Sequence, residues 1–296
     1  MDEMANREKK TLWENLLSID RRIIFIFIAL AIALPLFFKT SLKMPVSPVV
    51  QEVYNAIESL PAGSKVLISF DFDPGSMPEL QPMAESFFRH CFRKNLKVII
   101  MGLWPQGPIQ ANIALDKIFR ELKEEEKAVK VPRYGIDYVN LGFTAGNEVV
   151  IDRMGHDFQE SYPADAKGTP LSKIPLMQGV KNYDNIDLIL NLSAGYPGTQ
   201  EWVQYGVDVF HVKLAAGNTA VQAPSMYPYV QTGQLTGVLG GMKGGAEYEL
   251  ALKRPAKAVS YMFSQAIAHV VICLFIIIGN IAFFTLRKKK TLKLEK

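Results

Sequence analysis

Two long apolar runs, one near each end of the chain, constrain its fold more than any other feature of the sequence. The run 23–38, IIFIFIALAIALPLFF, contains no charged residue, and the run 266–286 is interrupted only by His269, Asn280 and Thr285. About 20 apolar residues span a bilayer as a helix, and flanking residues can extend a slightly shorter run. We therefore predict transmembrane helices at 23–38 and 265–286, with the lipid bilayer as a partner.

A cleaved signal peptide is the alternative interpretation of the first run. The segment that follows it, KTSLKMPVSP, lacks the small-x-small pattern of a signal-peptidase site. The charged lead of residues 1–22 is also long for the n-region of a signal peptide. These two features favour an uncleaved anchor.

Positively charged residues are unevenly distributed around the two runs. On the terminal sides lie Arg7, Lys9, Lys10, Arg21, Arg22, Arg287, Lys288, Lys289, Lys290, Lys293 and Lys296. On the inner sides lie only Lys39, Lys43, Lys253, Arg254 and Lys257. Because cytoplasmic flanks carry the excess of Lys and Arg, we predict cytoplasmic tails at 1–22 and 287–296 and an extracytoplasmic domain at 39–262. The expected location is the plasma (inner) membrane.

Composition excludes several classes of protein. Hydrophobic residues make up 49% of the 296 residues, which is enough for a sizeable core. The net charge of +4 is small and is concentrated in the C-terminal tail, so we expect no nucleic-acid partner. Cys91 and Cys273 are the only cysteines, which excludes a disulfide framework.

The central segment alternates between short apolar runs and amphipathic stretches. The apolar runs are 66–70, 98–103, 186–192 and 207–214, and each suits a buried strand of a parallel sheet. Residues 76–91 and 109–127 separate the first three of these runs with helical spacing of apolar residues, and Ser76 with Glu79 forms a capping-box pattern. This alternation predicts an α/β domain with a Rossmann-like, mostly parallel sheet.

The segment 128–185 fits this alternation less well. YVNLGF and EVVI, on either side of TAGN, suggest a short hairpin. The following stretch, 152–178, has no clear period, and a loop of this length is either functional or conceals further elements.

A glycine-rich stretch, QTGQLTGVLGGMKGGAEYEL, covers residues 231–250. It contains neither G-x-G-x-x-G nor a complete Walker motif, so we do not expect a phosphate-binding loop. Gly233, Gly237, Gly241 and Gly245 recur every four residues. We predict a helix with a glycine ridge that another backbone approaches closely. The ridge could pack on the protein's own sheet or on another subunit, and an exposed loop is the third possibility.

The strongest chemical signal is the stretch LISFDFDPGSMPEL. Asp71 and Asp73 lie where the first strand is expected to end, which faces the ligand crevice of an open α/β sheet. Two carboxylates at that edge could bind a divalent cation through oxygen ligands. Alternatively, they cap the turn that precedes the helix.

The D-x-D pattern of Asp71 and Asp73 resembles the first motif of haloacid-dehalogenase-type phosphotransferases and, more loosely, the metal-binding pair of some glycosyltransferases. The resemblance covers a handful of residues. Pro74-Gly75 stands where the phosphotransferases have Gly-Thr, and the second strand ends in MGLWPQG without the Ser or Thr of that family. No family resemblance extends over the length of the chain.

These observations lead to two functional hypotheses. The first is a non-catalytic assembly, scaffold or binding subunit of a membrane complex, with a protein partner or a homo-oligomer as its partner. The alternative is a metal-assisted extracytoplasmic hydrolase or transferase, with Asp71 and Asp73 as cation ligands and Ser193, Asn218 and Thr219 lining the crevice. The sequence names no cofactor beyond this possible divalent cation. A transport function would require more than two spans, or oligomerisation.

Overall fold

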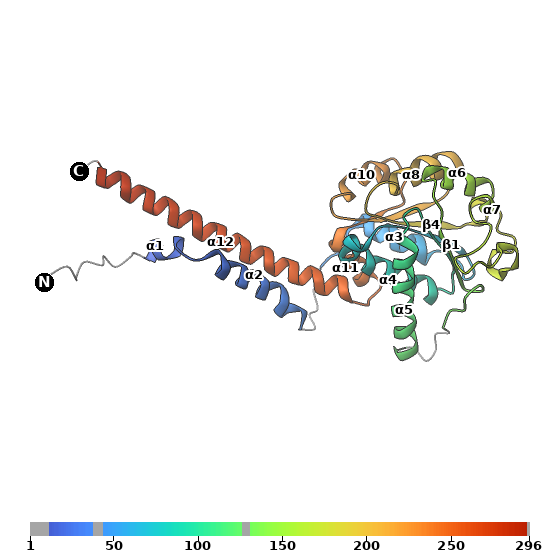
Figure 1. Ribbon diagram of the computed structural model, residues 1–296, viewed down its shortest axis with the longest axis horizontal. Coiled ribbons are helices and arrows are strands. Elements are labelled where there is room, and N and C mark those ends of the chain that lie inside the picture. The colour runs from blue at the N-terminus through green and yellow to red at the C-terminus, as the bar shows by residue number, and fades with distance from the viewer. Residues whose placement is uncertain (1–11, 38–43, 126–130, 295–296) are drawn as a thin grey trace. The chain divides into compact units, whose positions relative to one another are not determined.

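The structure is a computed structural model that describes residues 12–37, 44–125 and 131–294. The chain divides into two compact units (Figure 1). The division falls between residues 41–259 and residues 1–40 with 260–296; the described residues of the first unit form an α/β structure, and those of the second unit are helical. Residue 38 of the first expected span, and residues 39–43 at the start of the expected domain, lie outside the described residues.

A six-stranded parallel sheet is the centre of the α/β unit. The strand order is β3-β2-β1-β4-β5-β6, and every neighbouring pair is parallel. The strands are β1 (Lys65–Asp71), β2 (Lys97–Gly102), β3 (Tyr138–Phe143), β4 (Leu188–Ser193), β5 (Leu214–Asn218) and β6 (Val238–Gly240). The prediction of a parallel, Rossmann-like α/β sheet is therefore confirmed.

Four helices cover one face of this sheet: α3 (Pro48–Glu58), α4 (Met77–Arg93), α5 (Gly107–Glu125) and α11 (Gly241–Ala251). They bury apolar side chains against alternate residues of the strands, such as Ile68 and Phe70 of β1. A short 3-10 helix, η1 (Pro74–Ser76), precedes α4, and Pro78 in the first turn of α4 suits a helix start. Figure 1 shows α4, α5 and α11 on the side of the sheet opposite to α6, α8 and α10.

The second face is covered by shorter and less regular elements: α6 (Glu148–His156), α7 (Phe158–Ser161), α8 (Thr199–Glu201), α9 (Asp208–Phe210) and α10 (Ala223–Gln231). A π-helix, η5 (Trp202–Val207), continues α8. Three 3-10 helices complete this layer: η2 (Leu171–Lys173), η3 (Pro175–Met177) and η4 (Tyr183–Asn185). Leu67, Ile99 and Ile189 contribute from the sheet to the core on this side.

Two predictions of local structure were wrong. The run 207–214 is the end of η5 followed by α9, and β5 begins only at Leu214. Val207 and Phe210 reach the core from helical backbone, so their apolar pattern does not require a strand. The expected hairpin at 138–151 is β3, parallel to β2, followed by α6. The long irregular segment contains α7 and the 3-10 helices η2 and η3.

The helical unit consists of α1 (Leu12–Leu17), α2 (Arg21–Leu36) and most of α12 (Lys257–Leu294). Asp20 caps α2 by accepting a hydrogen bond from the backbone N–H of Arg22. Pro35 of α2 and Ala268 and Ala282 of α12 are buried. The rings of Phe27 and Phe275 meet edge to face with their centroids 6.0 Å apart, so α2 packs along α12.

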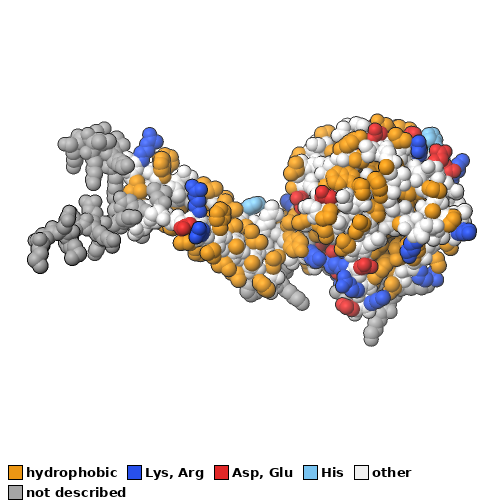
Figure 2. Space-filling model, viewed as in Figure 1, with side chains coloured by type: hydrophobic (Ala, Val, Ile, Leu, Met, Phe, Trp, Pro, Cys, Tyr) orange, Lys and Arg blue, Asp and Glu red, His pale blue; other side chains and the backbone are white. Residues whose placement is uncertain are grey.

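One helix among the described residues is long and apolar enough to span a membrane. It is the 31-residue segment Lys257–Arg287 of α12, which encloses the expected span 265–286. At 1.5 Å per residue it measures about 46 Å, against about 30 Å for a hydrocarbon core. Helix α2 has 16 residues and is shorter than the thickness of a hydrocarbon core. Figure 2 shows the helical unit covered mainly by hydrophobic side chains, whereas the α/β unit has a mixed surface.

Candidate functional site

The carboxyl ends of the central strands bring several predicted residues into one row. Asp71 at the end of β1 is the register partner of Ser193 on β4, and Ser193 is the partner of Asn218 on β5. The strand order reverses between β1 and β4, because the chain continues from β1 to β2 on one side and enters β4 on the other. In open α/β sheets this position is where ligands bind.

Asp71 is completely buried and receives hydrogen bonds from four groups. Both carboxylate oxygens accept from Ser69 Oγ, at 2.9 and 2.8 Å. The backbone N–H of Leu103 donates at 2.7 Å, Asn191 Nδ2 at 2.6 Å and Trp202 Nε1 at 3.3 Å. These donors surround the carboxylate that the sequence suggested as a cation ligand. Its neighbours are therefore hydrogen-bond donors, which satisfy an anion without a metal.

Burial dominates the protonation of this carboxyl group. Removal from water raises the pKa of Asp71 from 3.8 to about 7, because the charged form loses its hydration. The hydrogen bonds from Leu103, Ser69, Trp202 and Asn191 act in the opposite direction. Asp71 consequently changes charge near neutral pH, at the centre of the sheet edge.

A chain of hydrogen bonds connects Asp71 to the other predicted residues. Asn191, which donates to Asp71, accepts at its Oδ1 from Thr199 Oγ1 at 2.6 Å. Thr199 Oγ1 accepts in turn from Asn218 Nδ2 at 2.8 Å, and Asn218 Nδ2 also donates to Gln222 Oε1 at 3.1 Å. The sheet edge is thus joined to α8 and to the start of α10 by polar side chains.

Ser193 belongs to the same group of residues. Its Oγ lies 3.0 Å from the carbonyl oxygen of Gly195 and 3.3 Å from Gln222 Oε1. Gln222 Nε2 donates to the same Gly195 carbonyl at 3.1 Å. Thr219 participates through its backbone: its N–H donates to the Ser193 carbonyl at 3.4 Å, and its carbonyl accepts from Gln222. The structure therefore brings together Ser193, Asn218 and Thr219.

One polar atom in this group has no hydrogen bond. Asn218 Oδ1 is buried and has no partner among the described residues. An unsatisfied buried acceptor costs about 1–3 kcal/mol relative to a satisfied one. Asn218 Oδ1 is therefore the acceptor of this cluster for which the described residues supply no donor.

Asp73 is separated from this group by its contacts. Its side chain accepts a hydrogen bond from the backbone N–H of Ser76 at 3.2 Å and caps η1. The predicted capping box of Ser76 and Glu79 does not form, because Ser76 makes no side-chain cap and Glu79 accepts from the backbone N–H of Ala220 at 2.7 Å. Asp71 and Asp73 therefore have different hydrogen-bond partners.

A divalent cation bound by Asp71 and Asp73 was expected at this edge only under the alternative, enzymatic hypothesis. In the described part of the chain, no three His, Cys, Asp or Glu side chains come together in a way that could hold a metal ion. A divalent cation such as Mg²⁺ or Ca²⁺ takes six or more oxygen ligands, and Asp71 already accepts from four donors. The residues at this edge do not form the ligand set that such a cation requires.

The predicted glycine-ridged helix was wrong. Gly233 lies in a turn after α10 and Gly237 precedes β6, whereas Gly241 is the first residue of α11 and Gly245 lies within that helix. Gly233 and Gly241 have φ angles of +79° and +56°, a left-handed conformation that favours glycine. The four-residue spacing therefore arises from separate local requirements of a turn, a strand and a helix.

Three of these glycines lie close to the α/β unit itself. A Cβ atom at Gly237 would lie 2.3 Å from the carbonyl oxygen of Val49 in α3. At Gly241 it would lie 2.7 Å from Ala220, and at Gly245 it would lie 3.4 Å from Met83. At Gly233 it would meet no atom within 4 Å. The close approaches at 237, 241 and 245 are thus filled by this domain's own residues.

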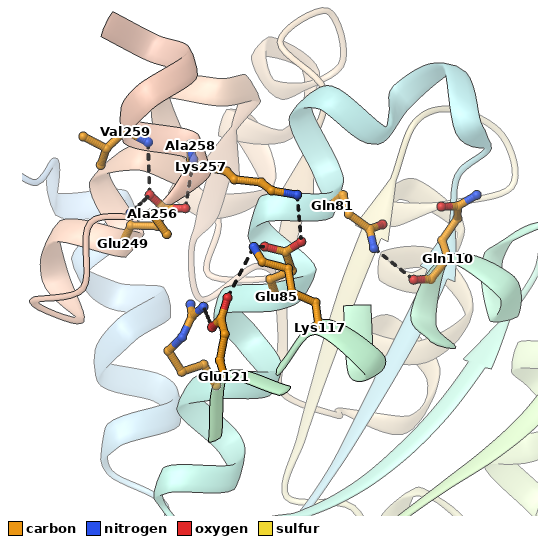
Figure 3. Close-up of polar contacts among 11 residues, drawn as sticks. Gln81, Glu85, Gln110, Lys117, Glu121, Glu249, Ala256, Lys257, Ala258 and Val259 are labelled. Carbon is orange, nitrogen blue, oxygen red and sulfur yellow. Dashed lines mark hydrogen bonds and ion pairs between the residues drawn. The ribbon is translucent and has the colours of Figure 1, made fainter. Parts of the chain in front are cut away.

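The start of α12 is attached to the α/β unit by buried polar contacts (Figure 3). Glu249 of α11 is buried, and its carboxylate accepts from the backbone N–H groups of Ala256, Ala258 and Val259 at 2.8–3.0 Å. A carboxylate at this position satisfies free N–H groups of a helix start and complements the helix dipole. Burial raises the pKa of Glu249, and the three N–H groups oppose that shift.

A second contact involves Glu85 on α4, which pairs with Lys117 of α5 and, at 3.9 Å, with Lys257 at the start of α12 (Figure 3). Only residues 252–256 separate α11 from α12. The first turn of α12 is therefore fixed to α11 and α4 by hydrogen bonds and an ion pair.

Sequence reasoning missed four members of the polar group: Asn191, Thr199, Trp202 and Gln222. Asn191 carried a usable signal, because it is a polar residue inside the apolar strand LILNL, and buried polar groups require partners. Thr199, Trp202 and Gln222 come after the ends of β4 and β5, in segments whose conformation the apolar pattern of the sequence did not predict. Trp202 begins a π-helix, and such irregular turns are frequent at functional sites.

Comparison with known proteins adds little to this geometry. No family model matches the sequence, and no curated protein matches it. Among solved structures, a trehalose-6-phosphate synthase, OtsA, is similar at 9% sequence identity and a TM-score of 0.31. The similarity covers 90% of this chain and 49% of the synthase chain, so this chain spans about half the length of that protein. A similarity this distant assigns neither function nor ligand.

Proposed function

We propose that this protein is a two-pass membrane protein whose α/β domain lies outside the cytoplasm and serves as a non-catalytic assembly, scaffold or binding subunit of a membrane complex. The observation that carries the proposal is α12. This helix begins on hydrogen bonds to Glu249 of the domain and continues as an apolar segment of 31 residues. Along it, side chains such as Val270, Ile276 and Phe284 are exposed to 57–60%. Such a surface is expected to face lipid.

Helix α2 is proposed as the second span. It packs along α12 and exposes Phe25, Ile26 and Leu34 on its other sides. Its 16 residues measure about 24 Å, and a short span is accommodated by local thinning of the bilayer or by flanking residues. The excess of Lys and Arg on the terminal sides of both helices supports cytoplasmic termini.

The non-catalytic role is supported by the polar group at the sheet edge. Asp71, Asn191, Thr199 and Asn218 are buried, and their hydrogen bonds run largely to one another. A buried group of this kind fixes the positions of β4, α8 and α10 and specifies one packing of the domain. The domain would then present a defined surface to a partner protein.

The alternative, a metal-assisted hydrolase or transferase, has two observations in its favour. The raised pKa of Asp71, about 7, suits proton transfer near neutral pH, and Asn218 Oδ1 has no hydrogen-bond partner among the described residues. This alternative would also require a nucleophile, a base, and either an oxyanion hole or a metal site.

Titration calorimetry with Mg²⁺, Mn²⁺ and Ca²⁺ distinguishes the two functions. We expect the purified full-length protein in mild detergent to give no saturable heat of binding at up to about millimolar cation, because the edge lacks a set of carboxylate ligands. Asp73→Ala is the matched variant, since Asp73 is only partly buried and its loss leaves the core intact. Saturable binding in the wild type that disappears in Asp73→Ala would favour the enzyme and overturn the non-catalytic proposal.

A further inference from the structure

Three polar side chains and Cys273 in the apolar part of α12 lie on one side of the helix, whereas Thr285, whose hydroxyl donates to the carbonyl of Ile281 in the same helix, lies on another side. Gln265, His269, Cys273 and Asn280 are separated by four, four and seven residues, and all four are exposed. At 3.6 residues per turn they fall within an arc of about 80°. We refer to these four residues as the polar face of α12. Polar residues inside membranes normally face protein. Their alignment on one side is therefore not expected for a helix that contacts only lipid.

This polar face is not the side that contacts α2. Phe275 of α12 meets Phe27 of α2 edge to face, and Ala268 and Ala282 are buried residues of α12. The same helical geometry places their mean direction about 120° away from the polar face. Helix α2 therefore leaves the polar face uncovered within the helical unit.

Asn280 shows what the polar face lacks. Its Nδ2 donates to the backbone carbonyl of Ile276 at 2.9 Å, one turn earlier in the same helix. For its Oδ1 the described residues offer no hydrogen bond, and the side chain is exposed. Water is absent from the hydrocarbon core, so an amide oxygen there is unsatisfied unless another protein chain supplies a donor.

The chemistry of the polar face fits a second copy of the same helix. Two copies inserted in the same direction and related by a two-fold axis along the membrane normal bring each residue opposite its own counterpart. An Asn side chain carries both a donor and an acceptor, so Asn280 can bond to its counterpart, and the ring nitrogens of His269 are available for the same kind of contact. Acidic side chains would repel their own copies, and this face contains none.

We propose that α12 pairs with α12 of a second copy through Gln265, His269, Cys273 and Asn280. This pairing rests on the proposed function, because it requires that α12 spans the membrane. It identifies the partner as this chain itself and leaves the surface of the α/β domain available for other contacts.

Cys273 allows the pairing to be tested in native membranes with the natural chain. Cys91 is fully buried in the domain core, and burial raises the pKa of its thiol to about 12, so it does not compete. Two Cys273 thiols join in a disulfide with loss of two protons to water, and two copper(II) phenanthroline complexes each accept one of the two electrons released. We expect a product of twice the chain mass of 33.1 kDa, which Cys273→Ser abolishes.

Two matched cysteine positions test the direction of the pairing. Leu274 and Ile281 are 51% and 48% exposed but point about 120–140° away from the centre of the polar face. Introduced as Leu274→Cys or Ile281→Cys in a Cys273→Ser background, they should crosslink several-fold less than Cys273. Asn280→Leu should lower the Cys273 crosslink about threefold or more, since a membrane-buried side-chain hydrogen bond contributes modestly to pairing. Thr285→Val, which removes a hydroxyl bonded to its own helix at Ile281, should leave the crosslink unchanged.

Each other result overturns the pairing. Equal crosslinking from Cys273, Leu274→Cys and Ile281→Cys would mean random collisions, and an unchanged yield in Asn280→Leu would mean that the amide plays no part. A product of a different mass would identify another protein as the partner. Extraction of the same membranes with alkaline carbonate separates the two proposals: a chain that stays in the membrane without crosslinking overturns the pairing alone, whereas a chain that is released overturns the membrane anchor as well.

Discussion

Replacement of Asp71 by Ala is expected to lower the free energy of unfolding by roughly 2–5 kcal/mol at about pH 5. The substitution leaves the Leu103 N–H, Asn191 Nδ2 and Trp202 Nε1 without an acceptor in a fully buried position. Each such donor costs about 1–3 kcal/mol, and partial rearrangement reduces the sum. Chemical denaturation of the full-length protein in detergent, followed by tryptophan fluorescence, measures this loss.

The cost of Asp71→Ala should also depend on pH in a defined direction. The pKa of Asp71 is raised from 3.8 to about 7 on folding, so the folded protein binds the proton more tightly than the unfolded chain. The stability that this group contributes is present below pH 3.8 and is lost as the pH rises through about 7. Between about pH 5 and pH 8, the free energy of unfolding of the wild type should fall by roughly 2–3 kcal/mol more than that of Asp71→Ala.

Asp73→Ala is the control for the Asp71 experiment. It removes a carboxylate two residues away that accepts one hydrogen bond as a helix cap, and such caps contribute about 0.5–2 kcal/mol. At about pH 5, a cost of Asp71→Ala that equals the cost of Asp73→Ala would contradict the buried hydrogen-bonded group described above. A cost that grows between pH 5 and pH 8 would contradict the direction of the Asp71 pKa shift.

Gly237→Leu should be among the most destabilising substitutions in the 231–250 stretch. Its Cβ alone would lie 2.3 Å from the carbonyl oxygen of Val49 and 2.9 Å from Val53 Cγ2. Because the first of these is a backbone atom of α3, helix and strand must separate to admit the side chain. Overpacking typically costs about 1–3 kcal/mol, and we expect at least the upper end of that range. Thermal melting of the full-length protein measures it.

Gly233→Asn is the matched control for Gly237→Leu. Gly233 meets no atom within 4 Å, and asparagine tolerates the left-handed conformation that its φ of +79° requires. Its melting temperature should stay close to that of the wild type. If Gly237→Leu melts like Gly233→Asn but changes the size of the protein in detergent, the region around Gly237 belongs to a subunit interface and not to the interior of this domain.

Much of the sheet was predictable, because buried parallel strands appear in the sequence as short apolar runs. The runs 66–70 and 98–103 correspond to β1 and β2 within one residue at each end. The run 186–192 is shifted by one or two residues from β4. Strand β6 was missed, since three residues between two glycines are too few to form a pattern.

The failures share a physical cause. Val207 at the end of the π-helix η5, Phe210 in α9 and Val212 after α9 all contact the core, so their spacing resembles a strand although the backbone is helical up to Phe210. At 231–250, glycines required by a turn and by close packing mimic a helical repeat. The periodicity of apolar residues indicates which residues face the core, but it does not indicate whether their backbone is helical or extended.

The candidate site was predictable only at the ends of strands. Ser193 and Asn218 were found because strand ends meet at one edge of a parallel sheet. Their partners Thr199 and Gln222 come from helices that begin after those strands, and their positions depend on loops whose course the sequence does not reveal. Asp71 was placed correctly at the end of β1, but its side chain points to donors of the core, which only packing determines.

The orientation of the α/β domain across the membrane tests the account most directly. Single cysteines are introduced as Lys123→Cys on α5 and Lys293→Cys near the C-terminus, in a Cys91→Ala, Cys273→Ala background. Lys123 is exposed on the domain, so the account predicts that an impermeant maleimide labels Lys123→Cys on intact cells and Lys293→Cys only after permeabilisation. Labelling of Lys293→Cys but not of Lys123→Cys on intact cells would place the domain in the cytoplasm and contradict the account.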